Sequence, residues 1–476
     1  MTSPRCRTAN LKLVSSIFRT TVTARALWTS IFNPFDRPKT VILAGFLLLT
    51  AVVMPNAPVR AQSDPLVITN FRYLDIYSRT MVSAASMVIE GGKIAAIDDP
   101  DYSCVGCQTI DLSGGYIVPG LIDLHQHLGN GGFARQTTSD RLVLFHNNLY
   151  WGITTAFNPS LPTDVLSSLR SAIRKNPEHY PRFLTAGRSI GPKDGWGDFK
   201  TATVGGLKAA INAQINAGAA VIKLSYDDKV WLSGSPLPIF SENALAAAIN
   251  YAHKRERRVF VHTTQVSMAK KAIRAGADGL TTGLISGKVD AELIGMMKSR
   301  RIVYMATLSA FAAIADNSAS AKRQLAFDPK RMNKSDLYQS LGSPIMTQNW
   351  LDWWPYSNLV PGKLATLAAN TKKLIDAGVT VGIGSDAGTP GVIFGASMLD
   401  EMQRHVEIGI RPVDAMVMAT FTNARILFLT EITGTIEAGK TADLVLLSSD
   451  PSKSISAFKD IVYTVRGGRV FDRRDF

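Results

Sequence analysis

Residues 120–130, GLIDLHQHLGN, form an apolar run that ends in two histidines separated by one glutamine. If residues 117–125 are a β-strand, alternate side chains project to the same side, so His125 and His127 leave its C-terminal end together. Two imidazoles in this arrangement could bind a metal ion. The alternative is a pair of surface histidines at the start of a loop, because so short a motif also occurs by chance.

Apolar runs of β character recur along the middle of the chain and alternate with helical patterns. One helical pattern, at 241–255, begins at Ser241, which we expect to be its N-cap. The alternation predicts a closed (β/α)8 barrel of parallel strands. A doubly wound sheet is the structural alternative, but it usually carries a glycine-rich phosphate loop where this chain has the histidine pair. The predicted strands lie at 117–125, 152–157, 181–186, 219–224, 258–263, 277–280, 302–306 and 379–384.

Both ends of this region show a different pattern, of short strands and tight turns. Glu90-Gly91-Gly92-Lys93 lies between two apolar stretches, as in a hairpin with glycine in the turn. We predict a composite β-sandwich of residues 62–116 plus 430–476 beside a barrel domain of residues 117–429. A segment at 308–362, which includes NWLDWWPYSN, interrupts the seventh unit. It is either a helical insertion packed on the barrel or a lid over its mouth.

An apolar run of 14 residues, VILAGFLLLTAVVM, follows Arg37 and Lys39. Small residues at the −3 and −1 positions before Gln62 predict that residues 1–61 are a signal peptide, cleaved after Ala61. The run is shorter than the roughly 20 residues of a membrane-spanning helix. We therefore expect a secreted or periplasmic protein without a stable membrane span. Anchoring by an uncleaved signal is the alternative.

Removal of this segment lowers the formal net charge from +14 to +7, because residues 1–61 hold eight Lys or Arg and one Asp. No dense basic block remains, so nucleic acid is not expected as a partner. Cys104 and Cys107 remain in the mature chain. A structural zinc or a thioredoxin-type redox pair lacks a matching second motif, so a local disulfide is the expectation for an exported protein.

Residues that could carry chemistry end four of the predicted strands. They are His125, His127, Lys223, His262 and Asp386. The C-terminal strand ends of a barrel meet at one face, where the active sites of this fold lie, so these five side chains are predicted to converge. Each of these residues alone has a structural explanation, such as a buried lysine paired with a carboxylate. Coincidence is a poor explanation for the occurrence of all five at predicted strand ends.

With these residues at its strand ends, the chain resembles the amidohydrolase superfamily of metal-dependent hydrolases, in particular its imidazolonepropionase-like and Xaa-Pro dipeptidase-like branch. The resemblance covers about residues 66–476 and implies a barrel with a flanking β-sandwich. It is highly specific for the superfamily and far less specific for a substrate. The segments that carry it are GYIVPGLIDLHQH, AAVIKLS, VFVHTT, GADG, GVTVGIGSDAG, TNAR and GTIEAGKTADLVLL.

The resemblance also implies roles for the site residues. His125, His127 and Asp386 would bind the first metal, and Asp386 would also take a proton from the attacking water. Lys223 corresponds to a lysine that reacts with carbon dioxide, because a carbamate bridges two cations where an ammonium is repelled. His262 corresponds to a ligand of the second metal. Zn²⁺ or a similar divalent ion fits these ligands, one or two per chain, with Fe or Mn left open.

One position departs from the branch. The segment GADGLTTG would show a histidine just before its last glycine, and this chain has Thr282 there. A neutral hydroxyl is a poor replacement for imidazole. Three outcomes are open: a one-metal enzyme with or without His262, a two-metal site completed by water or by Asp227 or Asp228, or a pocket that only binds ligands.

We therefore expect a hydrolase that cleaves a C–N bond of an amide, a cyclic amide or a short peptide through a metal-activated water. A one-metal deaminase and a non-catalytic binding protein of the same fold are the alternatives. The substrate stays open, since specificity in this superfamily lies in barrel loops such as 226–238. The oligomeric state, including a homo-oligomer, stays open as well.

Overall fold

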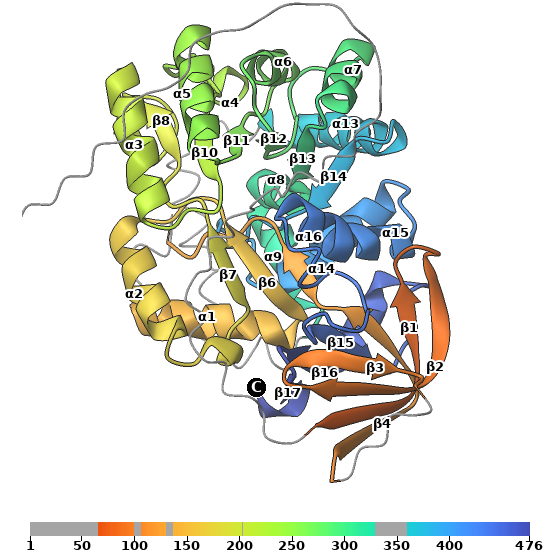
Figure 1. Cartoon of the computed structure of the whole chain (residues 1–476). Helices are drawn as coiled ribbons and strands as arrows, with labels where there is room; N and C mark the ends of the chain where they lie inside the picture. Colours follow the sequence, from red (N-terminus) through yellow and green to blue (C-terminus); the bar gives the residue numbers. More distant parts are fainter. Residues whose placement is uncertain (1–64, 100–105, 130–136, 202, 329–358) are drawn as a thin grey trace, which may run out of the picture. The chain divides into compact units, whose positions relative to one another are not determined.

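The computed structural model describes residues 65–99, 106–129, 137–201, 203–328 and 359–476 (Figure 1). The predicted signal peptide, Cys104 and the tryptophan-rich stretch at 349–358 lie outside these residues. Cys107 lies inside them and is disulfide-bonded. Across the described ranges, no helix has both the length and the apolar character needed to cross a bilayer.

Eight parallel strands form a closed barrel in the described part of the chain. Ala220 N–H donates to Thr185 O at 2.8 Å, and Leu124 N–H donates to Ile383 O at 3.2 Å; these bonds join a three-stranded sheet to a longer one. The structure thus confirms the predicted (β/α)8 barrel. Its strands are β5 (Leu121–Asp123), β6 (Ile153–Asn158), β7 (Arg182–Thr185), β10 (Ile222–Ser225), β11 (Val259–His262), β12 (Gly279–Thr281), β13 (Val303–Ala306) and β14 (Thr380–Ile383).

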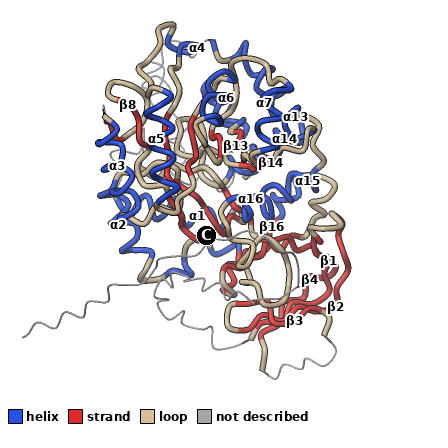
Figure 2. Tube along the Cα trace, turned by 45° about the horizontal axis from the view of Figure 1, so that its top comes forward, coloured by secondary structure: helices blue, strands red, loops and turns tan. Residues whose placement is uncertain are grey.

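Helices cover the outside of the barrel (Figures 1 and 2). In α5, the buried residues Leu245, Ala248, Ile249 and Ala252 follow the spacing of one helix face, which packs on the strands. Ser241 caps this helix by accepting the N–H of Ala244, as predicted. The other main helices are α1 (Thr138–Tyr150), α2 (Thr163–Ile173), α3 (Val204–Asn216), α5 itself (Glu242–Lys254), α6 (Val266–Arg274), α7 (Ala291–Ser299), α13 (Leu364–Asp376), α14 (Ala396–Glu407) and α15 (Pro412–Val417).

The beginning of the segment at 308–362 is helical. Helices α8 (Leu308–Ala315) and α9 (Asn317–Leu325) follow β13 directly, and α8 packs against α14. Residues 329–358 lie outside the described ranges, so the prediction of a lid over the mouth stays a prediction.

A second, seven-stranded sheet combines strands from both ends of the described chain. Strand β4 pairs antiparallel with β15, and Ile94 N–H donates to Lys440 O at 2.9 Å, so the sheet curves around its own apolar core. The expected hairpin is present, with Glu90 opposite Lys93. Figure 2 shows this sheet as a group of strands apart from the helices. Its strands are β1 (Leu66–Asp75), β2 (Thr80–Glu90), β3 (Lys93–Ile97), β4 (Gln108–Pro119), β15 (Leu444–Leu447), β16 (Ile461–Arg466) and β17 (Arg469–Asp472).

The connection between this sheet and the barrel is one residue long. Gly120 separates β4 from β5, and its N–H donates to Asp443 O at 2.8 Å. A Cβ atom on Gly120 would lie 2.1 Å from Thr154 Oγ1, so only glycine fits between the two strands. The carboxylate of Asp443 pairs with Arg182 of β7 at 2.9 Å and with Arg466 of β16 at 3.3 Å. The first barrel strand is therefore held in place by the sheet. The domain boundaries at residues 61, 116 and 429 remain predictions.

Candidate metal centre

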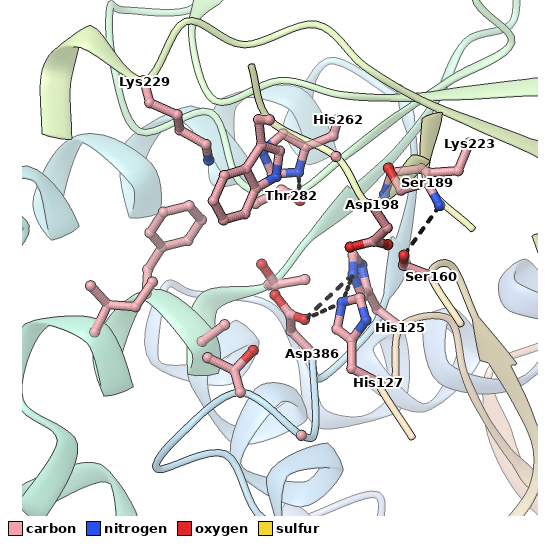
Figure 3. Close-up of a pocket in the computed structure, with 18 of the residues that line it drawn as sticks. His125, His127, Ser160, Ser189, Asp198, Lys223, Lys229, His262, Thr282 and Asp386 are labelled. Atoms are coloured by element: carbon pink, nitrogen blue, oxygen red, sulfur yellow. Dashed lines mark hydrogen bonds and ion pairs between the residues drawn. The ribbon is translucent and has the colours of Figure 1, made fainter. Parts of the chain in front are cut away.

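The five predicted site residues and Thr282 line one cavity of about 610 Å³ at the C-terminal ends of the barrel strands (Figure 3). His125 and His127 follow β5, Lys223 lies in β10 and His262 ends β11. Thr282 follows β12, and Asp386 follows β14. Segments more than 250 residues apart in the sequence thus meet at one barrel face, as the strand-end argument predicted.

His125, His127 and Asp386 form a group suited to a metal ion. Their candidate ligand atoms all lie within 4.8 Å of one another. Asp386 Oδ1 is 3.0 Å from His127 Nε2 and 3.4 Å from His125 Nε2, and the two Nε2 atoms are 3.1 Å apart. Three atoms with lone pairs thus face the same point, an arrangement that a shared cation stabilises.

The protonation states fit the same interpretation. Burial lowers the pKa of His125 well below its usual value, so this imidazole is neutral near pH 7. Burial alone would raise the pKa of Asp386, but the nearby His125, His127 and Lys223 hold it below its usual range, so Asp386 is an anion. Neutral imidazole and carboxylate are the forms that bind divalent ions such as Zn²⁺.

Close backbone packing brings Asp386 to the histidine pair. A Cβ atom on Gly384 would lie 2.8 Å from the Cβ of His125, so the glycine lets β14 approach β5. Asp386 N–H then donates to His125 O at 2.8 Å. Asp386 has a φ of +59°, an uncommon backbone conformation for which Asp is one of the better-suited residues. The backbone conformation at Asp386 therefore sets the position of its carboxylate.

Asp123, which sequence reasoning did not single out, supports both sides of this group. Its Oδ1 accepts the N–H of His125 at 3.0 Å and the N–H of Ser385 at 2.9 Å. Its Oδ2 accepts Ser385 Oγ–H at 2.6 Å and Gln126 Nε2–H at 2.9 Å. Burial raises the pKa of Asp123, against the effect of these donors. The feature of the sequence that could have identified Asp123 is the presence of an acidic residue inside the apolar run GLIDLH.

Asn423, from the TNAR segment, joins strands β5 and β14 through side-chain hydrogen bonds. Its side-chain amide donates to Ile122 O at 2.6 Å and to Ile383 O at 2.8 Å. Its carbonyl oxygen accepts the N–H of Ile383 at 3.1 Å. The segment thus has a structural role in closing the barrel beneath the site.

Lys223 lies in the cavity wall and is buried. Burial lowers its pKa to about 7, although the carboxylates of Asp386 and Asp198 act in the opposite direction. A large fraction of this amine is therefore uncharged near neutral pH. An uncharged amine is the form that can react with carbon dioxide.

His262 is held between Asp227 and Thr282. Its Nε2 lies 3.5 Å from Asp227 Oδ2, and its Nδ1 lies 2.9 Å from Thr282 Oγ1. Asp227 favours the ring proton on Nε2, which leaves the Nδ1 lone pair toward Thr282. Burial, together with Lys229, lowers the pKa of His262 to about 3, so the ring is neutral.

The alternative in which Asp227 or Asp228 completes a two-metal site receives no support from this geometry. Neither residue lines the cavity. Asp227 lies behind His262 and is fully buried, and its Oδ2 accepts the N–H of Thr264 at 2.8 Å. Thr282 has a φ of +75°, which is unusual for a β-branched residue and marks strain beside the cavity.

The charged residues of the cavity that sequence reasoning did not find include Asp198 and Lys229. Asp198 comes from the loop after β7, and Lys229 follows β10. The Lys229 ammonium lies 4.9 Å from the centre of the Trp196 ring and 3.6 Å from Asp227 Oδ2. Neither residue follows an apolar strand directly, so no local pattern marks it. The apolar part of the wall consists of Trp196, Trp231, Leu232, Ala310, Phe311 and Ile314.

Curated proteins with similar sequences include an imidazolonepropionase and an uncharacterized mycobacterial protein. An imidazolonepropionase of Thermoplasma volcanium is 26% identical over 416 residues, which are 82% of this chain and 92% of the relative. An uncharacterized protein of Mycobacterium tuberculosis is 27% identical over 219 residues, 44% of this chain. That match spans only 56% of the length of the mycobacterial relative.

Solved structures with the same fold include a Xaa-Pro dipeptidase with bound methionine in its active site. It is 23% identical, with a TM-score of 0.70, and the superposition covers 86% of this chain and 100% of the dipeptidase. An ochratoxinase of A. niger is 20% identical, with a TM-score of 0.66, covering 87% of this chain and 96% of that one. The sequence profile of the amidohydrolase family matches residues 116–471. The chain therefore belongs to the amidohydrolase family.

Proposed function

We propose that this protein is a metal-dependent hydrolase that cleaves the C–N bond of a small amide, a cyclic amide or a short peptide. The observation that carries the proposal is the convergence of His125, His127 and Asp386, with ligand atoms within 4.8 Å of one another inside the cavity. Family membership and the similarity to an imidazolonepropionase support the same reaction class.

A divalent ion such as Zn²⁺, when bound, acidifies water towards a pKa of about 7 and polarises the carbonyl of the substrate. Asp386 is the residue placed to move protons, because it is an anion at the centre of the ligand group. It accepts a proton from the attacking water and delivers it to the leaving nitrogen. His125 and His127 would hold the ion through their imidazole nitrogens, and His125 is kept neutral by burial, which lowers its pKa.

We infer that Lys223 contributes to cation binding after its uncharged amine has reacted with carbon dioxide. The nitrogen attacks the carbon of carbon dioxide and loses a proton, which gives an anionic carbamate. The depressed pKa of about 7 supports this step, since the free amine is abundant near neutral pH. The carbamate oxygen adds negative charge beside the histidine pair and strengthens cation binding.

The cavity wall favours a substrate with an apolar or aromatic group. Trp196, Trp231 and Phe311 line it, and Lys229 places a cationic side chain beside Trp196. A screen should therefore include N-acyl amino acids with aromatic side chains as well as dipeptides, lactams and lactones. A lactone that is hydrolysed while no amide is turned over would contradict the C–N assignment.

The test of the site compares the wild-type protein with His125→Ala and with His253→Ala, a half-exposed histidine on α5 that pairs with Asp278. We expect His125→Ala to lose both bound metal, measured by elemental mass spectrometry, and turnover of a substrate found in the screen. Chelation followed by return of Zn²⁺ should abolish and restore wild-type activity. A His125→Ala protein that hydrolyses the substrate at the wild-type rate would refute the site assignment.

We also infer that the protein is exported, with residues 1–61 removed. The support is the 14-residue apolar run at 41–54 and the small residues before Gln62. Expression of the full chain followed by N-terminal sequencing of the processed protein should give a sequence that starts at Gln62. Recovery of the uncut chain from the membrane fraction would instead establish an anchor.

A further inference from the structure

The loop after the third barrel strand is built onto the strand that carries Lys223. Within it, β8 (Ile190–Pro192) pairs with β10, and β9 (Phe199–Thr201) pairs with β8. Asp198 stands just before β9, and its N–H donates to Ser189 O at 2.8 Å. A Cβ atom on Gly191 would lie 1.8 Å from Trp196 O, so the loop is closed by a backbone contact that only glycine permits. The backbone of Asp198 is therefore firmly placed.

The carboxylate of Asp198 lies in the cavity with the predicted metal ligands. Figure 3 shows its side chain pointing into the cavity toward the histidine pair. Its Oδ2 atom is buried and has no hydrogen-bond partner. Arg188 donates to the backbone oxygen of Asp198 at 2.6 Å. A buried carboxylate oxygen without a donor is costly, unless a cation binds there.

The neighbouring Lys223 also bears on cation binding at this carboxylate. Asp198 and Lys223 line the same cavity and are close enough to interact electrostatically. Once Lys223 is a carbamate, the two groups are both anions and repel each other unless a positive ion lies between them. His262 Nδ1, which lies 2.9 Å from Thr282 Oγ1, is the third possible ligand atom on this side of the cavity, and a bound cation would take the place of the Thr282 hydroxyl as its partner.

We propose that Asp198 is a ligand of a second divalent cation, together with carbamylated Lys223 and His262, in place of the imidazole absent at position 282. The inference rests on the proposed function, because the first cation and the carbamate belong to it. The cation is a Zn²⁺- or Mn²⁺-type ion, which accepts mixed oxygen and nitrogen ligands. With fewer strong ligands than the first site, the second site fills at a higher free metal concentration.

The test is metal stoichiometry, measured apart from activity. Metal-free protein is incubated with bicarbonate and titrated with Mn²⁺, and bound metal is counted by elemental mass spectrometry. We expect wild type to bind one ion and then a second, with a spin-coupled Mn²⁺ pair in the electron paramagnetic resonance spectrum. Asp198→Asn should keep the first ion at wild-type affinity and lose the pair signal, with the second dissociation constant raised tenfold or more. Asp194→Asn, an exposed residue of the same loop, is the matched control.

A rescue variant separates ligand loss from loop damage. Asp198→Asn combined with Thr282→His should regain two ions, because histidine tolerates the positive φ of position 282 better than threonine does. The assignment would be overturned if the Asp198→Asn variant binds two ions as wild type does, or if it also loses the first ion. Wild type that hydrolyses its substrate but never binds more than one ion would overturn it and leave the proposed function standing. Wild type that binds no ion and shows no turnover would overturn the proposed function itself.

Discussion

Asp123 connects the two segments that carry the proposed metal ligands. One carboxylate accepts the N–H of His125 and the N–H of Ser385, so it connects the segments that carry the histidine pair and Asp386. Groups that orient metal ligands in this way typically contribute a factor of about 10 to 100 in metal affinity.

We therefore expect Asp123→Asn to weaken binding of the first metal by about 10- to 100-fold, because an amide cannot accept from all four donors. Competition with a chromophoric chelator measures the affinity. Asp111→Asn, an exposed aspartate of the β4 strand, serves as the control. An unchanged affinity with a lowered melting temperature would show that Asp123 stabilises the barrel without orienting the site.

At this scale the sequence predicted the residues whose role depends on their position in a strand. His125, His262 and Asp386 stand at or just after strand ends, and that position is visible as the end of an apolar run. Asp198 was not predictable in this way. Its place depends on the pairing of β8 with β10, a contact between segments separated by more than 30 residues.

Helix α8 shows how an element of the cavity wall is positioned. Ala310, Phe311 and Ile314 of this helix line the cavity. At its N-terminus, Glu401 of α14 accepts the N–H of Leu308 at 2.9 Å and the N–H of Ser309 at 2.6 Å. A carboxyl group from another helix thus accepts the free N–H groups at the start of α8.

This contact predicts a pH dependence of stability. Burial raises the pKa of Glu401 from 4.5 to about 8, against the effect of the N–H groups of Ser309 and Leu308. Between these values the folded state keeps a proton that the unfolded state releases, so the free energy of unfolding falls as pH rises from about 4.5 to about 8. Glu401→Gln removes this titration. Relative to the variant, wild type should lose about 3 kcal/mol between pH 4.5 and 7, measured by urea unfolding.

Glu407→Gln, at an exposed position of the same helix, is the matched control and should leave the pH profile of wild type unchanged. A difference between wild type and Glu401→Gln that stays constant across this pH range would show that Glu401 is ionised in the folded protein.

Elements were predictable from the sequence where local pattern and tertiary position agree. Barrel strands such as β6, β10, β11 and β13 are buried on both faces and consist largely of apolar residues, which is why they were predicted. Strands β8 and β9 were missed, because GPKDGWGDFK contains no such run and its strands exist only through pairing with each other and with β10.

For the molecule as a whole, Asp443 is a buried polar connection between the seven-stranded sheet and the barrel. Burial alone would raise its pKa, but Arg182 and Arg466 hold the pKa below its usual range. Replacement by asparagine would leave these guanidinium groups without their buried counter-charge. We expect Asp443→Asn to lower the free energy of unfolding by about 3 to 5 kcal/mol, measured by urea unfolding at fixed metal concentration.

Asp472→Asn is the control in the same sheet. Asp472 pairs with Arg474, whose side chain is 84% exposed, so its removal should cost less than about 1 kcal/mol. Equal effects of the two substitutions would mean that Asp443 does not connect the sheet and the barrel.

The composite sheet itself was predictable, since both ends of the chain have the same short-strand pattern. The ion pairs across it were not, because Arg182 and Asp443 lie 261 residues apart.

The single glycine between β4 and β5 has a consequence for the order in which the proposed metal site can form. During synthesis, the histidine pair emerges from the ribosome some three hundred residues before Asp443, whose backbone oxygen accepts the N–H of Gly120. A nascent chain therefore lacks this anchor of the first barrel strand, which carries the histidine pair at its end. We expect the proposed site to bind its ion only after the C-terminal strands of the sheet have been synthesised.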